Sequence, residues 1–234
     1  MKNSIKGISI VSETETEVIV KANAGEVWHE FVLWCIEKNY AGIENLSLIP
    51  GLVGAAPMQN IGAYGVEIKD VFEELEALDI NTGAPVKFKL SDCNFGYRES
   101  VFKNKYKNQY FITSVSFRLT KLSSPKAAYR FKTDYGDIKN TLAEMQVFDL
   151  TVKAVSNAVI KIRSSKLPDP KVLGNAGSFF KNPVITKSQF EKLIEQAQQP
   201  GQPKPALTPD ARRRYAENIA ELKILAQEAR KEKI

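Results

Sequence analysis

A nearly uncharged stretch rich in small residues, at positions 46–67, has the composition of a ligand-binding loop. Its glycines form two pairs, Gly51 with Gly54 and Gly62 with Gly65, each spaced by three residues. Glycines leave backbone N–H groups unshielded and allow a flat or phosphorylated ligand to approach closely. The same composition is also typical of a tightly packed apolar loop, so composition by itself leaves both interpretations open.

Two further stretches present one polar side chain among glycines and aromatic residues. Positions 94–100 place Arg98 between an aromatic residue and an acid, a setting typical of a surface ion pair and also of an anion-binding guanidinium. Positions 174–183 place Ser178 after two glycines and directly before two phenylalanines. That serine is either a reactive hydroxyl or part of a turn packed by its aromatic neighbours.

These three stretches occur in an order that resembles a known family when they are read with Tyr135-Gly136-Asp137 and with positions 165–171, Ser-Lys-Leu-Pro-Asp-Pro-Lys. They resemble the bacterial UDP-N-acetylenolpyruvoylglucosamine reductases, from about residue 5 to about residue 195. The enzymes of that family act in the synthesis of peptidoglycan precursors. Their FAD is reduced by NADPH and passes a hydride to the enolpyruvyl ether of the nucleotide sugar, giving UDP-N-acetylmuramate. The resemblance therefore implies an FAD-dependent, NADPH-linked oxidoreductase of cell-wall synthesis with a UDP-sugar substrate.

The resemblance also implies a role for each matched position. Arg98 matches the arginine that, with a glutamate, holds the enolate, and Ser178 matches the serine that delivers the last proton. Tyr135, Lys166 and Asn182 match positions that hold the substrate, where lysines suit a diphosphate. The predicted flavin contacts are Pro50, Gly51, Gly54, Ala55, Met58, Gln59, Asn60, Gly62 and Tyr64.

The sequence departs from the family's pattern at both ends. The family's flavin diphosphate loop reads Gly-x-Gly-Ser-Asn, and here no two glycines stand two residues apart. No Leu-Glu-Pro-Glu-Val type segment, which carries the family's catalytic glutamate, follows Pro183. These departures predict weak FAD binding. They also support a second hypothesis, a catalytically inactive remnant that acts as a binding or assembly module.

The strands that must position these residues are indicated by alternating apolar and polar residues. This pattern predicts a hairpin of positions 8–10 and 17–20, a second hairpin around the Asn81-Thr82-Gly83 turn, and a half-buried strand over positions 111–119. The expected fold class is α+β, with a mostly antiparallel sheet and flanking helices, as in the second subdomain of the FAD-binding fold.

Helical spacing of apolar residues predicts helices between these strands. One helix over positions 27–39 is expected to follow a capping box formed by Asn23 and Glu26, and another runs from Thr151 to about residue 166. Thr186 and Gln189 form the capping box of a third helix.

The chain is expected to divide into three parts. Residues 1–167 would be the second half of the flavin domain, 168–199 the start of the substrate-binding domain, and 200–234 a Pro/Gly linker followed by a C-terminal helix. That helix carries an apolar seam, which indicates either self-association or packing of the helix onto the chain's own sheet. The seam consists of Tyr215, Ile219, Leu222, Ala226 and Ala229.

Composition and charge agree with this class of protein. With 234 residues, 43% hydrophobic and 26% charged, the chain is in the globular range. Its net charge of +6 comes from basic residues interleaved with acidic ones, a pattern that argues against nucleic-acid binding. Apolar runs are too short for a membrane span, and the N-terminus has no signal-peptide core, which favours a cytoplasmic location.

Three further residues are predicted to be structural. Cys35 in a helix and Cys93 in a loop lack the spacing of a metal site and are expected to be reduced thiols. His29, the single histidine, is expected to be a buried or half-buried structural residue.

Overall fold

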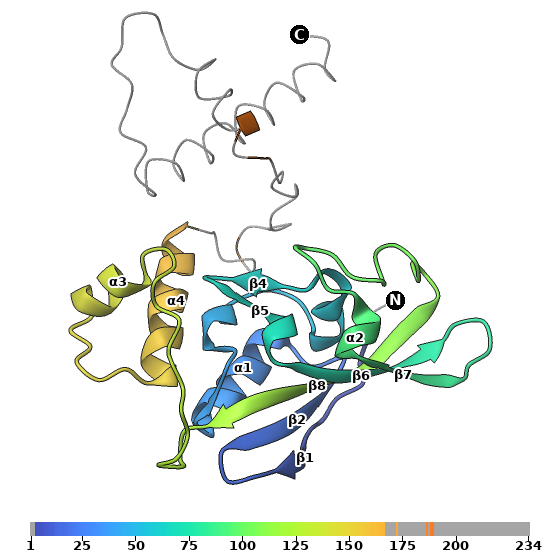
Figure 1. Ribbon diagram of the computed structural model, residues 1–234, viewed down its shortest axis with the longest axis horizontal. Coiled ribbons are helices and arrows are strands. Elements are labelled where there is room, and N and C mark those ends of the chain that lie inside the picture. Colours follow the sequence, from blue (N-terminus) through green and yellow to red (C-terminus); the bar gives the residue numbers. More distant parts are fainter. Residues whose placement is uncertain (1–2, 167–171, 173–185, 187, 190–234) are drawn as a thin grey trace, which may run out of the picture. The chain divides into compact units, whose positions relative to one another are not determined.

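The computed structural model describes residues 3–166, 172, 186, 188 and 189. A six-stranded sheet forms its centre, in the order β1-β2-β8-β6-β7, with β3 also paired to β8 (Figure 1). Every pairing in this sheet is antiparallel, which confirms the predicted α+β class with an antiparallel sheet. The strands of the sheet are β1 (Ile8–Glu13), β2 (Glu17–Asn23), β3 (Tyr40–Ala41), β6 (Phe72–Asp79), β7 (Pro85–Lys89) and β8 (Tyr110–Lys121).

A separate two-stranded hairpin and four helices complete the described part of the fold (Figure 1). Short 3₁₀ turns connect several of these elements. The hairpin and helices are β4 (Gly62–Ala63), β5 (Val66–Glu67), α1 (Trp28–Glu37), α2 (Leu90–Cys93), α3 (Ile138–Glu144) and α4 (Val152–Lys166). The turns are η1 (Glu44–Leu46), η2 (Val53–Ala55), η3 (Pro57–Gln59) and η4 (Ile68–Asp70).

The long strand β8 is central and carries the core. Phe117 packs against the rings of Trp28 and Phe31 on α1, with centroid distances of 5.8 and 5.2 Å. The predicted alternation is confirmed for Val115, Phe117 and Leu119, whereas a register shift against β6 buries Ile112 in place of Phe111 and Thr113. Ser114 and Ser116 on the polar face are also buried. Their burial follows from the position of β8 between β2 and β6, whose long charged side chains lie beside both serines.

Helix α1 is confirmed, but its predicted capping box is wrong. Val27 occupies the N-cap position, and no side chain caps the helix. Asn23 is the last residue of β2, where its side chain donates to the carbonyl of Lys6 at 2.7 Å. The Glu26 carboxylate instead accepts from the backbone N–H of Gly7 at 2.6 Å. Both predicted capping residues therefore bind the segment that enters β1.

The Cys93 loop is a second correction, because Cys93 ends helix α2 and is fully buried. Burial raises the pKa of its thiol to about 12, so the thiolate is disfavoured at neutral pH.

The predicted start of α4 is confirmed: the Thr151 hydroxyl accepts from the Ala154 N–H at 3.0 Å. Helices α3 and α4 pack together through Ile138 and Val159 in a small second core.

The chain forms two compact units, Met1–Gly177 and Ser178–Ile234. In the second unit the capping box is confirmed, since Thr186 N–H donates to Gln189 and Gln189 N–H donates back to Thr186. Within the described residues no helix has the length and apolar character to cross a membrane. The predicted three-part boundaries, the 200–205 linker and the C-terminal seam lie outside the described residues and stay predictions.

Glu76 is held by several donors on the polar face of the sheet. Lys21 pairs with its carboxylate, Ser114 Oγ donates to it at 2.9 Å, and Lys87 Nζ lies 3.3 Å away. These donors, Lys21 foremost, lower the pKa of Glu76 to about 2 from an ordinary value of 4.5. Because this pKa is depressed in the folded state, the stabilisation is present above pH 4.5 and is lost as the pH falls towards 2.

We therefore expect Glu76→Gln to lower the free energy of unfolding by about 1 kcal/mol at neutral pH, a value reduced by solvent screening. The deficit should shrink as the pH falls below about 4.5, the ordinary carboxyl pKa. Urea unfolding at several pH values measures it, with Glu74→Gln, which removes a single contact to Lys87, as the matched control. A deficit independent of pH contradicts the electrostatic explanation.

Candidate active site

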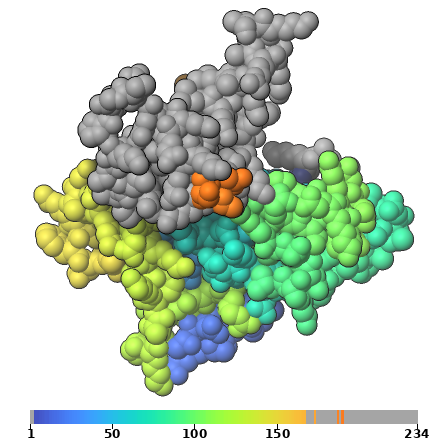
Figure 2. Space-filling view, turned by 45° about the horizontal axis from the view of Figure 1, so that its top comes forward, coloured from blue at the N-terminus to red at the C-terminus, as the bar shows by residue number. Residues whose placement is uncertain are grey.

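Several of the predicted site residues meet at the short hairpin formed by β4 and β5, two strands that Figure 1 labels. At its base, Arg98 Nη2 donates to the carbonyl oxygen of Gly62 at 2.6 Å. At its tip, a Cβ added to Gly65 would stand 3.4 Å from Cβ of Tyr135. In Figure 2 the teal residues around the hairpin lie between the green residues that follow α2 and the yellow-green residues that precede α3. Segments far apart in sequence therefore converge on one small hairpin.

Arg98 lies on a tight turn that presents its guanidinium to the hairpin. Gly96 and Glu99 close the turn with two reciprocal backbone hydrogen bonds of 3.1 and 3.2 Å. Arg98 has a φ of 53°, an uncommon backbone conformation for a residue other than glycine that clusters at functional sites. The guanidinium lies 5.7 Å from the centroid of the Tyr97 ring. Of its five N–H donors, the bond to Gly62 uses one, so others can face an anion.

The predicted flavin loop has an anchored side and an exposed side. The Gly54 N–H donates to the carbonyl of Ala24 at 3.0 Å, which fixes the loop to the end of β2. Apart from its two chain neighbours, no described residue has an atom within 4 Å of the place where a Cβ of Gly51 would stand. The exposed side is uncharged and mostly small, so it fits the approach of a flat ring such as the isoalloxazine of FAD. Its exposed residues are Pro50, Gly51, Ala55, Met58 and Gln59.

A tyrosine cluster lies at the tip of the hairpin. The Tyr64 side chain is hydrogen-bonded to Arg163, and burial raises the pKa of the Tyr64 phenol. A Cβ on Gly136 would stand 3.4 Å from the Tyr64 ring, so the segment that carries Tyr135 packs against Tyr64. Lys166 Nζ lies 3.6 Å from an Asp137 carboxylate oxygen, which brings this lysine to the same segment.

Comparison with known proteins connects this geometry to a family. Residues 1–89 match the FAD binding domain family. The UDP-N-acetylenolpyruvoylglucosamine reductase of Flavobacterium johnsoniae is 54% identical over 189 residues, which are 81% of this chain and 55% of that protein. Over the matched residues, the chain belongs to the UDP-N-acetylenolpyruvoylglucosamine reductase family.

Other members of the reductase family match to a similar extent. The protein of Amoebophilus asiaticus is 54% identical over 189 residues, covering 81% of this chain and 54% of its own length. That of Pseudomonas putida is 50% identical over 196 residues, covering 84% and 55%. A solved UDP-N-acetylenolpyruvylglucosamine reductase from Thermus caldophilus overlaps 70% of this chain and 48% of its own, with 24% identity and a TM-score of 0.48. The chain thus spans about half the length of the reductases it matches.

Sequence reasoning missed Arg163, which joins two parts of the reductase-like site. Its side chain is hydrogen-bonded to Tyr64, and its Nε donates to the carbonyl of Leu48 at 3.2 Å. Arg163 precedes Lys166 by three residues on α4, so helical spacing places both on the same face. That spacing was a signal from which Arg163 could have been predicted.

The structural role predicted for His29 is supported, because its Nδ1 accepts from the Leu48 N–H at 3.0 Å and burial lowers its pKa.

The structure brings five of the predicted site residues together, and two others lie outside the described residues. Gly62, Arg98, Tyr64, Tyr135 and Lys166 lie along the hairpin and its neighbours. Ser178 and Asn182 lie outside the described residues, so their predicted roles stay predictions.

Gly54 should tolerate no side chain, because a Cβ there would stand 2.5 Å from Cβ of Ala24. Gly54→Ala must push the flavin loop away from β2, and we expect a loss of about 1–3 kcal/mol in the free energy of unfolding. Gly96→Ala is the matched control, since its Cβ would meet only Glu99 Cβ at 3.5 Å. Equal stability of the two variants in urea unfolding would show that the loop is not anchored at Gly54.

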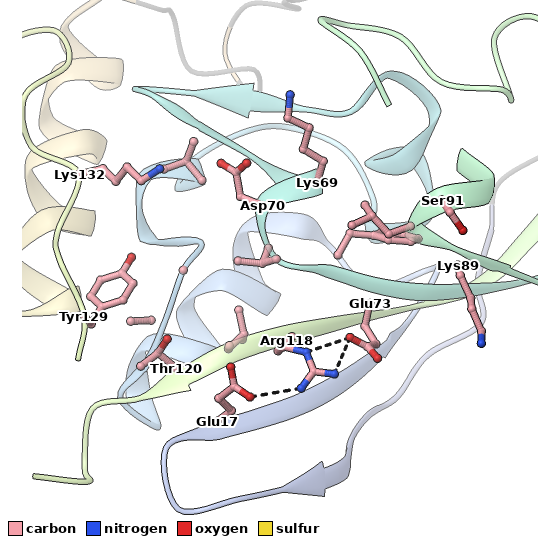
Figure 3. A pocket seen from close by; sticks show the side chains of 17 residues that line it. Glu17, Lys69, Asp70, Glu73, Lys89, Ser91, Arg118, Thr120, Tyr129 and Lys132 are labelled. Atoms are coloured by element: carbon pink, nitrogen blue, oxygen red, sulfur yellow. Dashed lines mark hydrogen bonds and ion pairs between the residues drawn. The ribbon is translucent and has the colours of Figure 1, made fainter. Parts of the chain in front are cut away.

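A cavity of about 780 Å³ lies elsewhere, lined in part by residues of β5, η4, β6 and β8 (Figure 3). None of the predicted site residues lines it. Arg118 on its wall is already paired with Glu73 at 2.8 Å and with Glu17 at 3.3 Å, as the dashed lines show. The Tyr129 hydroxyl donates to Glu44 at 2.6 Å. Because these polar groups are satisfied by the protein, we assign no ligand to this cavity.

Proposed function

We propose that this chain forms the flavin-binding and substrate-reducing site of a UDP-N-acetylenolpyruvoylglucosamine reductase of peptidoglycan precursor synthesis, working with FAD and NADPH. The observation that carries the proposal is the contact of the predicted catalytic Arg98 with Gly62 of the predicted flavin loop. A guanidinium fixed beside a flavin loop suits the reduction of an enolpyruvyl carboxylate, because it can stabilise the negative charge that develops. Identities of 50–54% to reductases of this name support it.

When bound, FAD would supply the hydride that NADPH provides. The exposed side of the loop around Gly51, Ala55 and Met58 would hold its ring, because those residues offer a small, uncharged surface. Hydride addition to the enolpyruvyl double bond places negative charge on the carbon next to the carboxylate. Arg98 would stabilise that charge through its remaining N–H donors without giving up a proton.

The last step is protonation of that carbon, which we assign to Ser178. A serine hydroxyl is a weak acid, but a carbanion-like carbon is a strong base, so a short transfer path is sufficient. Tyr135, Lys166 and Asn182 would hold the nucleotide sugar. Lys166 lies on the exposed end of α4, where its ammonium group would exchange its 3.6 Å contact with the exposed Asp137 carboxylate for a diphosphate.

Titration of the chain with FAD, followed by flavin absorption and fluorescence, tests the cofactor assignment. We expect saturable binding, then bleaching of the bound flavin by NADPH and recovery of the oxidised spectrum on addition of UDP-N-acetylglucosamine enolpyruvate. No spectral change at any FAD concentration, together with no recovery by the sugar nucleotide, would overturn the proposed function.

A further inference from the structure

Asn60 connects the predicted flavin loop to the Arg98 turn, and its side chain is hydrogen-bonded within the protein. It is fully buried, with 0% relative exposure. Nδ2 donates to Glu67 Oε2 and to the carbonyl of Gly96, both at 3.0 Å. Oδ1 accepts from the Lys69 N–H at 3.1 Å. A side-chain amide carries two N–H donors, so Asn60 has none left for a ligand.

These bonds hold the two groups that place Arg98. The Gly96 carbonyl that accepts from Asn60 also accepts from the Glu99 N–H, the bond that closes the arginine turn. Glu67 is paired across the hairpin with Gly62, whose carbonyl accepts from Arg98 Nη2. Asn60 therefore contacts the backbone of the arginine turn at Gly96. It also contacts Glu67, the strand partner of Gly62, whose carbonyl accepts from Arg98.

A second bond ties the same two segments at the other end of the turn. Ser100 Oγ donates to the carbonyl of Met58 at 2.7 Å, two residues before Asn60. The Arg98 backbone has a positive φ, a conformation that persists only when its surroundings hold it in place. The arginine turn and the flavin loop thus form one hydrogen-bonded unit, with Asn60 at its buried centre.

We propose that Asn60 is a positioning residue for Arg98, locking the arginine turn to the flavin loop, and not a direct flavin contact. The consequence for catalysis rests on the proposed function, because it takes Arg98 to be the group that meets the substrate. The lock itself does not depend on that function and can be tested in the ligand-free chain.

Asn60→Asp is the informative substitution. Asn60 has a φ of 44°, and aspartate tolerates this left-handed conformation nearly as well as asparagine. The change replaces the donating amide group with a carboxylate oxygen that faces two acceptors, Glu67 and the Gly96 carbonyl. At least one of the two bonds is lost while the backbone is kept, because a carboxylate donates no hydrogen bond and a protonated carboxyl group donates one. Asn81→Asp makes the same chemical change on the exposed β6–β7 turn and is the matched control.

The first measurement is the rate at which phenylglyoxal modifies individual arginines, read by peptide mass spectrometry without any ligand. In Asn60→Asp we expect Arg98 to react about fivefold faster or more, as expected from the loss of one or two hydrogen bonds. Arg118, held by Glu73 and Glu17, should keep its parent rate. Asn81→Asp should change neither rate. An unchanged rate at Arg98, or an equal rise at both arginines, overturns the proposal.

The second measurement is a double-mutant cycle on the reoxidation of reduced flavin by the sugar nucleotide. Asn60→Asp should slow this half-reaction by about tenfold or more in the parent and by less than about threefold when Arg98→Lys is already present, because the two changes act through one group. Equal slowing in both backgrounds contradicts a role through Arg98. A parent chain without this half-reaction contradicts the proposed function, and the modification rates then decide the role of Asn60.

Discussion

Arg98→Lys is expected to lower turnover of UDP-N-acetylglucosamine enolpyruvate by about 100- to 1,000-fold, the usual effect of losing a preorganised electrostatic donor. Lysine keeps the charge but lacks the planar fork that donates to the Gly62 carbonyl and to a carboxylate at once. Steady-state rates and the separate flavin half-reactions measure the effect. The loss should be confined to the oxidation of reduced flavin by the sugar nucleotide.

Arg130→Lys is the matched control for this prediction. The Arg130 side chain is 90% exposed, and its ion pair within the described part of the chain is with Asp134 at 3.5 Å. We therefore expect its replacement to leave turnover unchanged. Thermal unfolding of both variants checks that each is folded. Turnover of Arg98→Lys within about threefold of the parent would remove Arg98 from the site, since that is far below the effect of a preorganised donor.

Ser178→Ala is expected to block formation of UDP-N-acetylmuramate while sparing reduction of the flavin by NADPH. The hydroxyl is assigned only to the protonation that completes reduction of the sugar nucleotide, so it should be silent in the first half-reaction. Stopped-flow recording of flavin bleaching by NADPH, and then of reoxidation by the substrate, separates the two steps.

Ser12→Ala, an exposed serine on β1, is the control for loss of a hydroxyl away from the site. It should change neither half-reaction. If Ser178→Ala slows both half-reactions equally, the serine is a structural turn residue, as its glycine and aromatic neighbours also allow.

The strands and helices could be predicted wherever the signal is local. The alternation over residues 111–119 reports directly on β8, and the Thr151 hydroxyl caps α4 as predicted. The errors arise where distant segments compete for the same groups. Asn23 and Glu26 have the spacing of a capping box, but their side chains are hydrogen-bonded to the backbone of Lys6 and Gly7, in the segment that enters β1.

The candidate site could be predicted in part, and its connections could not. Sequence motifs indicated Arg98 and the flavin loop separately, yet the bond from Arg98 to Gly62 exists only because the hairpin and the arginine turn fold against each other. The use of Asn60 within the protein follows from the same packing, since its partners Glu67 and Gly96 come from different segments. No pattern in the sequence near Asn60 distinguishes an asparagine that contacts a ligand from a buried asparagine that is hydrogen-bonded within the protein.

Conversion of the sugar nucleotide itself is the most direct test of the proposed function. The chain is incubated anaerobically with FAD in excess, NADPH and UDP-N-acetylglucosamine enolpyruvate, and the nucleotide sugars are analysed by mass spectrometry. We predict a product heavier than the substrate by one hydride and one proton, formed in step with NADPH oxidation and nearly absent with Arg98→Lys. Substrate recovered unchanged under saturating FAD would contradict the proposed function and would favour a binding or assembly module without catalysis.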